Sequence, residues 1–265
     1  MIDTLRAEHT KLRSLDGVRW LLLATAASLV VVGAALAATV DADRCASEVG
    51  CSLDPVKTSL GGVWIAQIAV CVLGVLAVST EYDTAQIGVT LAAMPRRLAV
   101  LVAKAVAVVS LVVGAAAVGT LGALVAGRAV LGPGGVAIAP PGTGPVRPSL
   151  TDALTVRAGV GTTLYLALVA VLAVGIAAVR RETASAIVTV LGLLFLFPLL
   201  GLVITDPVWQ QRLHRYAPMD AGLTVQATRD LDRLAVGPWS GLGVLAAYSL
   251  AALGVGAVQF MRRDP

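Results

Sequence analysis

The chain has 265 residues, of which 57% are hydrophobic and only 14% are charged, and its formal net charge is +4 at pH 7. Soluble domains carry about 25% charged residues; here the apolar residues also fall in long blocks with the charges between them, which excludes an ordinary soluble domain. The basic residues are dispersed near the ends of these blocks, so the positive charge does not indicate a nucleic-acid partner.

The N-terminal segment, residues 1–19, precedes the first apolar block and carries charges of both signs. Its apolar residues fall on one helical face: Ile2, Leu5, Leu12 and Leu15. This pattern predicts an amphipathic helix lying in the membrane interface, in contact with lipid head groups. The alternative is a charged tail that only sets the orientation of the first span.

Six apolar blocks approach the roughly 20 residues that a helix needs to cross about 30 Å of hydrocarbon. They cover residues 20–40, 61–80, 102–126, 159–179, 186–204 and 241–261. We therefore predict an all-α membrane protein with a six-helix transmembrane domain over residues 20–261 and a short tail at 262–265. Lys104 is an exception in spans that otherwise contain almost no ionisable side chains. Proton-coupled carriers and intramembrane enzymes need such groups at depth, so both are disfavoured.

Arginine and lysine are densest in the short connections on the side of the two chain ends. The positive-inside rule then places both termini in the cytoplasm. The chain is rich in alanine, valine, glycine and leucine, uses arginine far more than lysine, and has no asparagine. We interpret this composition as that of a GC-rich bacterial genome, which predicts a multi-pass protein of the bacterial plasma membrane.

The cytoplasmic segment after the second predicted span has a helical pattern of its own. Thr80 with Asp83 is close to a capping box, and Ile87, Leu91 and Met94 then repeat at helical spacing. Pro95 ends the pattern, and Arg96 and Arg97 follow it. The sequence predicts a short amphipathic helix, which either presents its surface to a cytosolic protein or only lies on lipid.

The outer loops and the spans contain a few polar groups that could serve a function. Cys45 and Cys51 lie in one outer loop, where they either form a disulfide or remain free thiols. In the last outer loop, residues 223–234 could form one short amphipathic helix. Some polar residues of the spans either line a pathway or bond to neighbouring helices: Thr162, Thr163, Tyr165 and Tyr248.

Several motifs that carry chemistry are missing from the sequence. It has no G-x-x-x-x-G-K-[ST] phosphate loop, no H-E-x-x-H and no G-x-S-x-G. Its three cysteines form no paired Cys-x-x-Cys motif of the kind that holds zinc. We therefore expect no catalytic residues, no metal site and no cofactor on this chain, and predict that it is not an enzyme.

Several short motifs together resemble the type-two permeases of ATP-binding-cassette (ABC) exporters. The loop between spans two and three carries the resemblance through Glu81-Tyr82, Ile87, Thr90-Leu91, Pro95-Arg96-Arg97 and Lys104. Glu8-x-x-Lys11-Leu12-Arg13-Ser14 is similar to the family's interfacial entry helix. Tyr216-x-Pro218-x-x-Ala221-Gly222 and Pro238-Trp239-x-Gly241 are similar to its last outer loop.

The resemblance implies a permease subunit that forms the membrane pathway of an exporter. A separate cytosolic nucleotide-binding ATPase would bind ATP and Mg, and a second permease subunit, identical or different, would complete the pathway. The resemblance assigns contact with the ATPase to six residues: Glu81, Tyr82, Ile87, Leu91, Arg96 and Arg97. The alternative is a membrane anchor or assembly factor that docks a cytosolic protein without transport.

Small residues recur every fourth position along the third predicted span, at Ala115, Gly119, Ala123 and Gly127. Such a face permits close approach of another helix. The sequence leaves open whether that helix belongs to the same subunit or to a second one.

Overall fold

The computed structural model describes residues 2–39, 54–83, 97–130, 150–204 and 206–262, and these residues form helices and loops without any strand. Within these described ranges, six helices are long and apolar enough to cross a membrane. They are α2 (Asp16–Ala38), α5 (Val63–Asp83), α7 (Arg97–Val130), α8 (Ala153–Arg180), α9 (Thr183–Val203) and α12 (Pro238–Arg262). The predicted all-α membrane fold with six spans is therefore confirmed.

The observed helices extend beyond several of the predicted spans. For example, α7 begins at Arg97 and ends at Val130, whereas the apolar block covers residues 102–126. The difference arises because hydropathy measures only the stretch that lies in hydrocarbon. A helix keeps its own backbone hydrogen bonds and continues into the polar interface.

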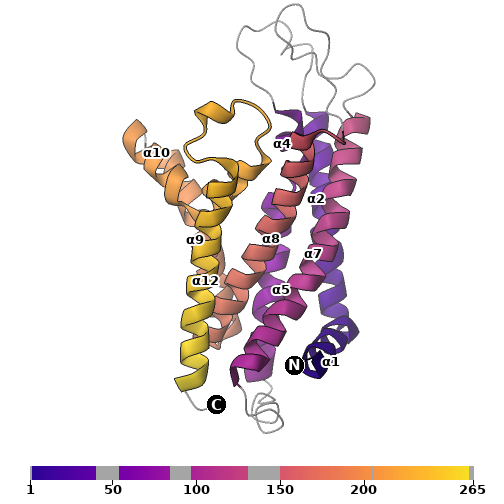
Figure 1. The fold of residues 1–265 in the computed structure, drawn as a ribbon, viewed down its shortest axis with the longest axis vertical. Helices are drawn as coiled ribbons and strands as arrows, with labels where there is room; N and C mark the ends of the chain where they lie inside the picture. The colour runs from indigo at the N-terminus through magenta and orange to yellow at the C-terminus, as the bar shows by residue number, and fades with distance from the viewer. Residues whose placement is uncertain (1, 40–53, 84–96, 131–149, 205, 263–265) are drawn as a thin grey trace, which may run out of the picture.

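Helix α8 is the centre of the bundle and packs against α5, α7, α9 and α12 (Figure 1). Small residues let its neighbours approach closely: a Cβ atom added at Gly175 would lie 2.5 Å from the backbone nitrogen of Leu253 in α12. Likewise, one added at Gly74 in α5 would lie 2.7 Å from the Cβ of Ala173 in α8. Van der Waals packing of this kind replaces the hydrophobic effect as the force that joins helices in lipid.

The small-residue face of the third span packs within the chain. A Cβ at Gly119 would lie 2.7 Å from Leu29 of α2, and one at Gly127 would overlap Ser59. Ser59 belongs to α4 (Pro55–Ser59). Of the two arrangements that the sequence left open, the structure shows packing inside one subunit.

Both chain ends lie at the same end of the bundle, which we call the terminal end (Figure 1). There α1 (Ile2–Ser14) packs on α7 and also contacts α2. The opposite end carries α4, α10 (Pro207–Tyr216), α11 (Pro218–Leu223) and the 3-10 turns η1 (Thr224–Gln226) and η2 (Leu231–Arg233).

The single helix expected over residues 223–234 is not present, because the chain breaks between η1 and η2. Asp230 has a left-handed backbone with φ 49°, which does not continue a helix. In addition, the carboxylate of Asp54 accepts hydrogen bonds from the backbone N–H groups of Thr228 and Arg229. These long-range bonds occupy donors that a helix would have used.

Candidate functional site

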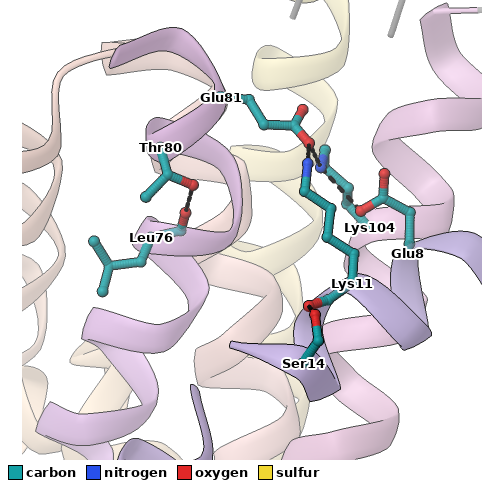
Figure 2. Close-up of polar contacts among 7 residues, drawn as sticks. All are labelled: Glu8, Lys11, Ser14, Leu76, Thr80, Glu81 and Lys104. Atoms are coloured by element: carbon teal, nitrogen blue, oxygen red, sulfur yellow. Dashed lines mark hydrogen bonds and ion pairs between the residues drawn. The ribbon is translucent and has the colours of Figure 1, made fainter. Parts of the chain in front are cut away.

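Four charged side chains from three helices meet at the terminal end of the bundle and form what we call the ionic cluster (Figure 2). The cluster consists of Glu8 and Lys11 on α1, Glu81 on α5 and Lys104 on α7. Lys104 Nζ lies 3.0 Å from Glu8 Oε2 and 2.6 Å from Glu81 Oε1. Lys11 Nζ lies 2.5 Å from the same Glu81 oxygen. Two ammonium groups and two carboxylates therefore balance each other.

The local sequence explains how the cluster assembles. Glu8 and Lys11 are three residues apart on α1 and therefore lie on the same helical face. Glu81 lies in the last turn of α5, where the helix dipole disfavours a negative charge. Lys104 lies two turns into α7, within the apolar part of the chain. Each of the two inner charges is thus unfavourable alone and is stabilised by the other.

Three members of the cluster are deeply buried. Glu81 is 1% exposed, Lys104 3% and Glu8 7%, whereas the side chain of Lys11 is 42% exposed. Moving an ion out of water costs several kcal/mol, so buried charges persist only when they are paired. One oxygen, Glu81 Oε2, is buried and accepts no hydrogen bond from the residues that the structure describes. The cluster therefore fixes α1 against the ends of α5 and α7.

The end of α5 is held by further contacts on its other sides. The Arg181 guanidinium lies 5.2 Å from the centre of the Tyr82 ring, a cation–π contact. The same ring meets Phe260 of α12 edge to face at 6.5 Å between centroids. Thr183 at the start of α9 donates a hydrogen bond to Ser79, with 2.7 Å between the hydroxyl oxygens. Contacts from α1, α7, α9 and α12 thus converge on one turn of α5.

The structure describes only part of the predicted ATPase contact. Glu81 and Tyr82 lie in the contacts just described, and the Glu81 side chain points into the protein. Arg97 is the first residue of α7, and nothing is described of its side chain. Ile87, Leu91 and Arg96 lie outside the described residues, as do Cys45 and Cys51. A third cysteine, Cys71, is free and buried.

The partners in the ionic cluster could not be predicted from the sequence. The available signal was Lys104, an ionisable residue in spans that contain almost no others. Its partner Glu8 is 96 positions away in the chain. No local spacing rule relates two such residues, so only the packing of α1 on α7 reveals the pair.

Of the four polar residues singled out in the spans, three make hydrogen bonds within the protein and Tyr248 packs against the core. Tyr165 donates to Gln67 Oε1 at 2.6 Å. Thr162 donates to the Ala158 carbonyl oxygen at 2.7 Å and accepts from the Gln226 amide at 3.0 Å. Thr163 donates to a carbonyl of its own helix, and Tyr248 packs partly buried against the core. That they line a pathway stays a prediction.

A cavity of about 600 Å³ opens at the opposite end of the bundle, between α4, α5, α10, α11 and the turns that follow. Its wall includes Lys57, Trp64, His214, Asp220 and Asp232. Burial raises the pKa of the Asp220 carboxyl, and the nearby His214 only partly opposes that effect. Among the described residues, no three His, Cys, Asp or Glu side chains converge as metal ligands.

The fold and its sites define a multi-pass, all-α membrane protein with a buried ionic cluster at one end and a cavity at the other. No protein-family model and no curated protein sequence matches the chain.

Proposed function

We propose that this chain is the permease subunit of an ABC-type exporter, driven by a separate cytosolic ATPase that binds ATP and Mg. The observation that carries the proposal is the ionic cluster, taken together with the motifs between spans two and three. In this reading the terminal end faces the cytoplasm of a bacterial cell, and α1 lies in the membrane interface.

The position of the cluster supports a role in coupling. Glu81 is two residues from the described end of α5, and Lys104 lies seven residues after the start of α7 at residue 97. The chain between these helices, residues 84–96, contains the predicted coupling helix. Because the ion pair joins the two helices that flank this segment, a push on the segment would move α5 and α7 together.

The cluster also ties α1 to α5 and α7, so α1 would move with these two helices. The helix buries Glu8 and Leu12 toward the bundle and exposes Arg6, Arg13 and Ser14. This two-sided character suits a helix that lies flat on a membrane with basic groups near lipid phosphates. Movement of α5 would then tilt α1 and, through α2, reach the opposite end.

We infer a second permease subunit from the way the helices pack. The interior of the six-helix bundle is occupied by α8, most of whose side chains are buried in the core. By contrast, α9 is little covered within the chain, with Val188 70% and Leu202 82% exposed. Such surfaces must face lipid or another copy. We propose that two permeases, identical or different, enclose the pathway between them.

The proposal is tested by reconstituting the chain in lipid nanodiscs with the nucleotide-binding ATPase encoded beside its gene. ATP hydrolysis should rise several-fold over that of the ATPase alone. Replacing two apolar residues of the predicted coupling helix, Ile87→Asp with Leu91→Asp, should abolish this stimulation and leave membrane insertion intact. Val208→Asp is the matched control, because Val208 is 56% exposed and lies on α10 at the opposite end.

The outcomes separate the proposal from its alternative, a membrane anchor or assembly factor without transport. Stable binding of the ATPase without any change in its turnover would favour the anchor. Full stimulation by the doubly substituted chain would rule out coupling through this segment. Failure of the ATPase to bind would remove both hypotheses.

A further inference from the structure

The cavity at the end opposite the termini has the size and construction of a ligand site. Its volume of about 600 Å³ lies within the range of roughly 300–1,000 Å³ that is usual for small-molecule pockets. Apolar surface is provided by Trp64 and Leu223, and polar groups by Gln210 and Gln226. Gln226 is 3% exposed, and its amide is fixed by a hydrogen bond to Thr162.

The charged side chains in the cavity wall differ in how far they are exposed to solvent. Lys57 and Asp232 are exposed to solvent and opposite in sign, so they largely cancel each other. Asp220 is different, because its side chain is only 15% exposed and its Oδ2 atom is buried without a hydrogen bond. His214 Nδ1 lies 3.3 Å from that oxygen, but the imidazole is 55% exposed and is charged only when protonated.

A carboxylate in this position lacks a permanent counter-charge. Desolvation penalises its ionised form, which is why its pKa is raised. A cation that enters the cavity would supply both the missing charge and the missing hydrogen-bond donor. Trp64, which is 43% exposed, lines the same cavity, and an aromatic ring is suited to contact a cation.

We propose that this cavity binds an organic ammonium ion, with the ammonium group on Asp220 and the apolar part against Trp64 and Leu223. Two sources share this chemistry: a free amphipathic amine and the amino head group of a membrane lipid. The inference rests on the cavity and does not depend on the proposed transport function.

The proposal includes a pH dependence with a definite sign. The titratable groups around Asp220 are His214 on α10, Lys57 on α4, Asp232 in η2 and Tyr165 on α8. As the pH falls, the Asp220 carboxyl takes up a proton and loses the charge that would hold the ammonium group. Ammonium binding therefore weakens on acidification. His214→Gln removes the imidazole that lies 3.3 Å from Asp220, and the same direction of pH dependence is expected in that variant.

The test uses the full chain in detergent, with lipid removed, and equilibrium dialysis of phenethylamine at pH 7.5. Its uncharged counterpart, 2-phenylethanol, is measured in parallel. We expect saturable binding of the amine only. Asp220→Asn should weaken binding at least tenfold, and Trp64→Leu should weaken it several-fold with the carboxylate intact. Asp152→Asn is the control, because Asp152 is exposed and its side chain makes no cap bond.

Circular dichroism establishes that each variant is folded. Absence of saturable amine binding, equal binding of the alcohol, or equal affinities of the Asp220 and Asp152 variants would each overturn the proposal. Nanodiscs then distinguish the two sources. Weaker phenethylamine binding in phosphatidylethanolamine than in phosphatidylglycerol shows that a lipid amine occupies the cavity, whereas equal binding identifies a free amine as the ligand.

Discussion

Replacing Lys104 by methionine is the sharpest test of the ionic cluster. Methionine has a similar length and no charge, so the change leaves Glu8 and Glu81 facing one remaining cation, Lys11. The lost ammonium is 3% exposed and contacts both carboxylates, at 3.0 and 2.6 Å. Breaking a buried ion pair by removing one member costs about 3–5 kcal/mol. We therefore expect the free energy of unfolding to fall by about that amount.

Lys11→Met is the matched comparison, because it removes the same group from a position that is 42% exposed. Glu81 keeps Lys104 in that variant, so the expected loss is about 0–1 kcal/mol, as for surface pairs. At about 2–4 °C for each kcal/mol, the unfolding midpoint in detergent should fall by about 6–20 °C for Lys104→Met and by no more than about 4 °C for Lys11→Met.

A double variant checks the electrostatic origin of the effect. Glu8→Gln combined with Lys104→Met leaves Glu81 with Lys11 and restores charge balance. It should be more stable than Lys104→Met alone, because no uncompensated charge stays buried. Equal losses for the two lysine variants, or no recovery in the double variant, would refute the reasoning.

Three further predictions concern other parts of the fold. Gly175→Ala should lower the free energy of unfolding by about 1–3 kcal/mol, because its methyl group would meet the α12 backbone at 2.5 Å. Gly192→Ala has no neighbouring atom within 4 Å and should instead stabilise α9 by about 1 kcal/mol. Equal thermal midpoints for the two variants would contradict this prediction. Asp54→Ala removes the acceptor of two backbone N–H groups after η1, so hydrogen exchange at those amides should rise at least tenfold, and unchanged exchange would argue against it. Asp220→Asn should raise the unfolding midpoint at pH 8 and have no such effect near pH 4. The reason is that burial raises the pKa of this carboxyl in the folded state. The stability that the carboxyl contributes is therefore present below its ordinary pKa and is lost as the pH rises through the raised value. Parallel stability curves for the two proteins would contradict this sign.

The transmembrane layout could be predicted because the bilayer imposes a length and a polarity on each span. For example, the apolar block at 186–204 corresponds to α9, Thr183–Val203, within three residues. The small-residue face containing Gly119 was also visible as a four-residue period. The sequence does not show which helix packs on that face, because Ala, Val and Leu side chains of any of the six helices could pack there equally well.

The irregular end of the bundle could not be predicted for a related reason. Its shape depends on single hydrogen bonds between distant residues, such as the one from Thr228 to Asp54, 174 positions apart. The left-handed backbone of Asp230 likewise follows from no local pattern that the sequence displays. The lining of the Asp220 cavity likewise comes from segments far apart in the chain, such as those of Lys57 and His214, so no local pattern predicts it.

The sequence by itself determined that the chain enters a membrane, how many times it crosses, and which residue in the spans carries an unusual charge. These properties depend on transfer from water to lipid, which acts on each segment separately. Only the tertiary structure decided that Lys104 pairs with Glu8 and Glu81, and that a buried carboxylate faces a cavity. Those outcomes depend on distances between segments, and such distances exist only after the helices have packed.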